Sequence, residues 1–145
     1  MTKTEAKVLV REIGKLAILG GFLTRIVAKR LPVEESEDLF VIPARISNAD
    51  VFSVLKSVGR ITDEFASERS IDTISAIVGS GHMNLNPTIV HVRVAESSIT
   101  STTLSVHALA KEGLVKQQSA KRAVERIGTL ISSQHAEQPI RVDSP

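Results

Sequence analysis

Two histidines on neighbouring β-like runs are the residues of this chain best placed to do chemistry. His91 lies in "TIVHVRV", residues 88–94, and His107 lies in "ITSTTLSVHALA", residues 99–110. Alternation of apolar and polar residues places both on the polar face of a predicted sheet. That face supplies the candidate ligand-binding residues: His91, Arg93, Thr103, Ser105 and His107. A polar row of this kind faces solvent in most antiparallel sheets, but it can also line a cavity or an interface.

The predicted spacing of the two histidines argues against a shared metal ion. If residues 96–98 form a three-residue turn, His91 lies opposite Thr103 and His107 lies opposite Pro87. The imidazoles are then four residues apart along the ladder, roughly 13 Å. A two-histidine site would need a slipped register, so we predict no metal and no cofactor. The chain has no cysteine, which removes thiolate ligands and disulfides as well.

The stretch "GSGHMNLNP", residues 79–87, is the most unusual in the chain. It lacks the third glycine of a dinucleotide fingerprint and the Gly-Lys-Ser/Thr of a phosphate loop, and a strand follows it in place of a helix. Gly79-Ser80-Gly81 also lacks the nucleophile elbow G-x-S-x-G. The stretch therefore predicts a connection between two strands, with turns made by its glycines and asparagines.

Four acidic residues could pair for acid–base catalysis: Asp63, Glu64, Glu68 and Asp72. Charged residues on a strand surface are routine, so the solvated face of a hairpin explains them better. We assign no catalytic residue, and the sequence favours a protein without enzymatic activity over an enzyme.

Composition and charge limit the classes of partner. The 145 residues include 42% hydrophobic but only 3% aromatic residues, which leaves little material for base stacking. The net charge of +2 is unevenly spread, because residues 1–30 carry seven bases and two acids while residues 31–72 carry nine acids and four bases. The basic charge belongs to the N-terminal segment, so no nucleic-acid partner is expected.

The elements that position these residues follow from periodicity. Residues 4–30 read as a basic amphipathic helix interrupted at Gly20-Gly21, and the acidic residues 32–38 after it read as a linker. A strand at residues 39–42 precedes a helix capped by Ser47 or Asn48 and ended by Gly59. The remaining predicted elements are a strand spanning Ile61 and Phe65, strands over residues 71–78, 88–94 and 99–110, and a helix over residues 116–132.

This order predicts an α+β fold, with an antiparallel sheet of four to five strands, helices packed on one face, and the amphipathic helical segment in front. The order over residues 38–132 resembles small folds in which a curved antiparallel sheet grips a C-terminal helix, and also TATA-binding-protein-like folds. We divide the chain into a helical segment (1–31), a linker (32–38), an α+β domain (39–132) and a mobile tail (133–145). Val124 and Ile127 should be buried on the sheet, and a chain starting near Val33 should stay folded.

Two functions fit these features. The first is a non-catalytic binding or assembly module, in which residues 1–31 mediate self-association, dock a protein partner or bind an anionic membrane surface. The alternative is a small-ligand carrier or enzyme that uses a pocket between the sheet and the C-terminal helix. We expect a cytoplasmic location, peripheral to the membrane if the N-terminal segment binds lipid.

Overall fold

The computed structural model describes residues 1–16, 21–113 and 116–136, without the side chains of residues 21–23, 82 and 136. The mobile tail predicted at residues 133–145 falls partly within α4, and its residues 137–145 lie outside the described residues. The elements are α1 (Lys3–Leu16), α2 (Gly21–Arg30), β1 (Val33–Ile42), α3 (Asn48–Val58), β2 (Gly59–Ile61), β3 (Thr73–Ser80), the 3₁₀ turn η1 (His82–Asn84), β4 (Asn86–Ser97), β5 (Thr102–Lys111) and α4 (Ser119–Ala136).

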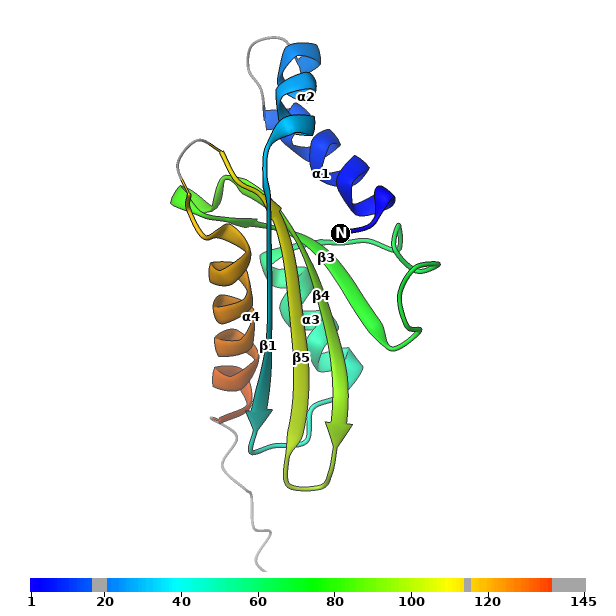
Figure 1. Ribbon diagram of the computed structural model, residues 1–145. Helices are drawn as coiled ribbons and strands as arrows, with labels where there is room; N and C mark the ends of the chain where they lie inside the picture. Colours follow the sequence, from blue (N-terminus) through cyan, green and yellow to red (C-terminus); the bar gives the residue numbers. More distant parts are fainter. Residues whose placement is uncertain (17–20, 114–115, 137–145) are drawn as a thin grey trace, which may run out of the picture.

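The strands form one antiparallel sheet in the order β1-β5-β4-β3-β2, which confirms the predicted α+β class (Figure 1). The acidic residues predicted as a linker are instead part of β1, a ten-residue edge strand paired along β5 from Val33 to Ile42. The linker prediction was wrong because it was based on the high content of acidic residues, and an exposed edge strand can also carry many charges. Such charges protect an edge strand from pairing with another chain. The strand predicted to reach Phe65 ends at Ile61.

α3 and α4 cover one face of the sheet and enclose the main core. Val124 and Ile127 of α4 are buried there as predicted, in one cluster with Val90, Val92, Leu104 and Val106. Gly128 lets the ring of Phe40 lie close to α4, since a Cβ on this glycine would come within 2.3 Å of that ring. α3 begins with a capping box between Ser47 and Asp50 and ends before Gly59, as its sequence predicts.

α1 packs against the opposite face of the sheet. Its Val8 and Leu9 are buried in a second apolar cluster with Phe65, Ile77, Ile89 and Leu109. Arg11 of α1 forms a two-bonded ion pair with Glu64, at 2.7 Å for each bond. Helices therefore lie on both faces of the sheet, and α1 contributes to the core of the domain from which the sequence analysis had separated it.

The β4–β5 register differs from the predicted one by four residues. His91 lies directly opposite His107, and the predicted pairing of His91 with Thr103 is wrong. The turn is wider than assumed: Ser97 pairs with Thr102, the hydroxyl and amide of Ser98 bond to Ser101, and a bulge follows Val94. Because four is an even number, the apolar and polar faces stay as predicted.

The stretch at residues 79–87 is a strand connection, as predicted. β3 ends at Ser80 and β4 begins at Asn86, with η1 between them. Gly81, Met83 and Asn84 all have positive φ angles of 55–71°, which reverse the chain in a few residues.

Candidate functional site

A row of polar residues crosses four strands on the face that α4 does not cover. Ser75 of β3 pairs with His91 of β4, which pairs with His107 of β5, which pairs with Glu37 of β1. One step along the sheet, Thr73, Arg93 and Ser105 form a second row. Sequence residues far apart thus meet at one place because strand pairing aligns them side by side.

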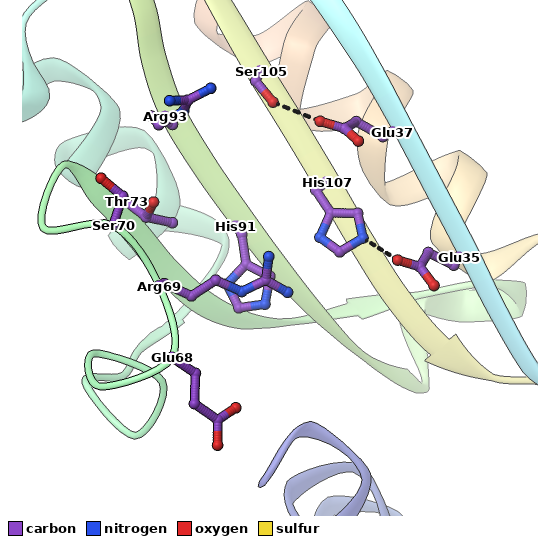
Figure 2. Close-up of a pocket in the computed structure, with 10 residues that line it drawn as sticks. All are labelled: Glu35, Glu37, Glu68, Arg69, Ser70, Thr73, His91, Arg93, Ser105 and His107. Carbon is purple, nitrogen blue, oxygen red and sulfur yellow. Dashed lines mark hydrogen bonds and ion pairs between the residues drawn. The ribbon is translucent and has the colours of Figure 1, made fainter. Parts of the chain in front are cut away.

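Apart from Ser75, the residues of these two rows line a pocket of about 420 Å³, drawn in Figure 2. Its size is in the range of small-ligand sites. The pocket is lined by Glu35, Glu37, Glu68, Arg69, Ser70, Thr73, His91, Arg93, Ser105 and His107. Arg93, Ser70, Thr73 and Glu68 lie on one side of the histidines, and Glu35 and Glu37 lie on the other, while the Arg69 guanidinium overlaps His91 in this view (Figure 2).

His91 is held on both ring nitrogens and is only 3% exposed. Its Nε2 lies 3.1 Å from Glu5 Oε1 and its Nδ1 lies 2.8 Å from Ser75 Oγ. Burial, reinforced by the charge of Arg69, lowers the pKa of His91 to about 4, so the ring is neutral at pH 7. Because a carboxylate only accepts, Nε2–H donates to Glu5 and the Ser75 hydroxyl donates to Nδ1.

Glu5 reaches the pocket floor from α1 and is fully buried. Its carboxylate bonds to the guanidinium of Arg69 and accepts a hydrogen bond from the Thr2 amide at 2.7 Å. Burial raises the pKa of Glu5, but the bonds from Arg69 and Thr2 outweigh burial and the pKa is lowered overall. The buried carboxylate is therefore ionised and paired, and it ties α1 to β4 and to the loop that carries Arg69.

His107 stacks on His91, with ring centroids 5.7 Å apart and planes 18° apart. Its Nε2 donates to Glu35 Oε1 at 2.7 Å, and this bond lowers the pKa of Glu35. The buried Nδ1 of His107 has no partner among the described residues, and the same holds for Nε of Arg69. Buried polar atoms without a partner are uncommon in folded proteins, and both of these belong to residues that line the pocket.

In the second row, Arg93 carries a guanidinium that no described residue binds. Ser105 Oγ donates to Glu37 Oε1 at 2.9 Å. Arg93 is exposed, and its guanidinium forms no hydrogen bond or ion pair with any residue that the structure describes. Four of the five predicted site residues therefore line the pocket, whereas Thr103 pairs with Val41 and Glu96 and lies outside the lining.

The pocket does not lie where the alternative function placed it. The space between the sheet and α4 holds the apolar core, and the pocket is on the other face, beside α1 and the segment before β3. The sequence analysis missed the lining residues Glu35, Glu37, Arg69, Ser70 and Thr73, and also Glu5 and Ser75, which bond to His91. The alternating glutamates of β1 were a usable signal, while nothing local marks Glu5, which is 86 positions from His91.

Ser75, His91 and Glu5 have the residue types of a catalytic triad, but the serine is not presented to a substrate. Ser75 is 6% exposed and is not among the pocket residues. The opposed histidines also do not create a metal centre, because each Nε2 is bonded to a carboxylate and no cluster of three metal-ligating side chains occurs among the described residues. The bonds to Glu5 and Glu35 fix the orientation of the two imidazole rings.

Comparison with protein-family models, with curated proteins and with solved structures finds no match, so the resemblance noted above rests on element order alone. Within the described part of the chain, no helix has the length and apolar character required to cross a membrane.

Proposed function

We propose that this protein binds a small polar molecule that carries an anionic group at one end and hydrogen-bond donors at the other, such as an amino acid. The observation that carries the proposal is the separation of charge across the pocket: Arg93 stands on one side of the stacked histidines, and Glu35 and Glu37 stand on the other. The proposal is of binding, without a reaction.

The anionic end fits the side of Arg93. A guanidinium offers a planar fork of N–H donors that matches a carboxylate or phosphate with two parallel bonds. Arg93 has no competing acid partner among the described residues, and Thr73, its neighbour across β3, adds a hydroxyl. Arg69 is less available, because Glu5 already binds it.

The end of the ligand that carries hydrogen-bond donors fits the side of the pocket formed by β1. Glu35 accepts one bond from His107 and lies 3.8 Å from the N-terminal ammonium of Met1, and Glu37 accepts one bond from Ser105. Each carboxylate keeps lone pairs for an ammonium or hydroxyl group of a ligand. These protein bonds hold both carboxylates in position before a ligand arrives. Such preorganisation lowers the entropy that binding costs.

Titration calorimetry with a panel of zwitterionic amino acids tests the proposal, with acetate and methylamine as matched half-ligands. We expect a zwitterion to bind at least tenfold more tightly than either half-ligand, since each end adds a charge-assisted bond. Arg93→Gln should weaken that binding by about tenfold or more. Arg45→Gln removes an exposed arginine outside the pocket and is the matched control.

Equal binding by the Arg93→Gln variant and the parent, or equal weakening by Arg45→Gln, would contradict the proposal. So would the absence of binding by every member of the panel.

An assembly role for residues 1–31 has less support than the sequence suggests. The apolar side chains Val8 and Leu9 of α1 pack within the chain's own core, so they are not available to a partner. α2 and the end of α1 keep exposed apolar side chains, with Leu16 53% and Val27 58% exposed.

A further inference from the structure

One end of the molecule combines exposed apolar side chains with an excess of positive charge. α2 stands beyond the end of the sheet and packs on α1 (Figure 1). Its Ile26 and Val27 are 40% and 58% exposed, and Leu16 at the end of α1 is 53% exposed. Leu16, Leu31 and the 60%-exposed Leu85 share one groove of about 310 Å³, which brings the β3–β4 connection to the same end.

The charge at this end is of one sign. The described residues 13–16, 21–31 and 116–118 include Lys15, Arg25, Lys29, Arg30 and Lys116 and no acid. The three nearest acids along the chain are already engaged. Glu34 accepts the backbone amides of Ala120 and Lys121. Glu12 bonds to Arg11, Lys15 and Arg60, and both carboxylate oxygens of the buried Glu112 accept backbone N–H groups.

We propose that this end, formed by α2, the last turn of α1 and the β3–β4 connection, docks on the surface of an anionic lipid bilayer. Val27 and Arg30 are three residues apart on α2, as are Ile26 and Lys29, so apolar and basic side chains lie side by side. Apolar groups of such a helix enter the boundary between headgroups and acyl chains, while the basic groups stay among anionic headgroups.

Charge decides between the bilayer and other occupants. A second copy bound through the same patch about a two-fold axis would bring the basic residues of the two copies together, which disfavours association. Nucleic acid would satisfy the charge but would leave Leu16, Ile26 and Val27 in water. An anionic bilayer satisfies both properties of the surface.

Cosedimentation with phosphatidylcholine vesicles, with and without phosphatidylserine, tests this inference. The full chain should bind the phosphatidylserine vesicles at low salt, bind the neutral vesicles much less, and lose binding at high salt as the charges are screened. Reversing two charges with Lys29→Glu and Arg30→Glu should lower partitioning by at least about tenfold. Val27→Asp should also lower it, because the apolar contact is replaced by a repelled charge.

Two matched variants control for nonspecific effects. Lys56→Glu reverses an exposed base on α3, and Ile99→Asp alters an 87%-exposed residue in the β4–β5 loop at the far end of the molecule (Figure 1). Both should bind vesicles like the parent. All altered side chains are exposed, so thermal melting should show folded proteins.

Several outcomes would overturn the inference: no vesicle binding by the parent, equal binding to neutral vesicles, or equal losses in the control variants. A dimer in analytical ultracentrifugation that Val27→Asp dissociates would assign the surface to a second copy. Binding of a single-stranded oligonucleotide without vesicle binding would assign it to nucleic acid. None of these outcomes depends on the ligand pocket.

Discussion

At the residue scale, the chain from Ser75 through His91 and Glu5 to Arg69 is the most consequential feature of the pocket floor. Every hydrogen-bonding atom of the His91 ring is satisfied, and the Phe65 ring packs edge-on against it with centroids 5.2 Å apart. Hydrogen bonds at both of its nitrogens orient the buried His91 ring strongly, because any rotation of the ring leaves a polar group unpaired. His91 therefore provides a rigid platform on which His107 stacks.

The lowered pKa of His91 predicts a pH dependence of stability. In the unfolded chain this histidine takes up a proton near its ordinary pKa of 6.5, whereas the folded protein resists protonation until about pH 4. Stability contributed by neutral His91 is therefore complete above pH 6.5 and falls as the pH decreases from 6.5 to 4. The loss between pH 8 and pH 5 should be roughly 2 kcal/mol.

Urea unfolding of the parent and of His91→Gln at pH 8 and pH 5 measures this effect. The variant is expected to be less stable at both values but to lose less stability on acidification, because glutamine takes up no proton. The same loss in both proteins would assign the pH dependence to other groups.

At the element scale, the N-terminus of α4 is capped by two carboxylates from outside the helix. Glu112, just after β5, accepts the amides of Gln117 and Ser119, and Glu34 of β1 accepts the amide of Ala120 at 2.9 Å. Carboxylates are favoured at a helix N-terminus by the unpaired N–H groups and the helix dipole. Burial, a hydrogen bond to Glu112 and the charge of Glu112 raise the pKa of Glu34, as expected for two carboxyl groups placed close together.

Removing one of these carboxylates should separate capping from repulsion. Glu112→Ala is expected to cost about 1–2 kcal/mol of unfolding free energy, because two N–H groups lose their acceptor. Glu34→Gln should cost less, since glutamine keeps an acceptor oxygen and ends the like-charge contact. Chemical denaturation provides the measurement, and Glu125→Ala on the exposed side of α4 provides the control. A larger cost for Glu34→Gln than for Glu112→Ala would refute this account.

At the scale of the whole molecule, helices pack on both faces of the sheet but leave part of one face uncovered. α3 and α4 cover one face, while α1 covers only part of the other and leaves the pocket open beside it. Arg11–Glu64 and Glu5–Arg69 fasten α1 across that face. Removal of residues 1–31 would expose Phe65, Ile77 and Ile89, so this packing argues against the expectation that a chain starting near Val33 stays folded.

Two core substitutions compare the faces directly. Leu9→Ala on α1 and Ile127→Ala on α4 should each destabilise the protein by roughly 2–5 kcal/mol, because both side chains are fully packed. Leu16→Ala changes an exposed residue of α1 and should alter stability by less than about 0.5 kcal/mol. Thermal and urea unfolding measure all three, and a negligible effect of Leu9→Ala would show that α1 is dispensable to the fold.

Periodicity along the chain was enough to predict the α+β class, α3 with its cap, the central strands, the burial of Val124 and Ile127, and the polar face that carries His91 and His107. These features depend on side-chain alternation and on residues a few positions apart, so they can be read from a short segment of the sequence. The pairing of His91 with His107 depended on turn width and on one bulge, which alternation does not encode because a shift of four residues preserves it. The ionised Glu5 beneath His91, the glutamates that β1 brings alongside His107, and the position of the pocket away from α4 arise from contacts between distant segments, and only the packing of the complete chain decides them.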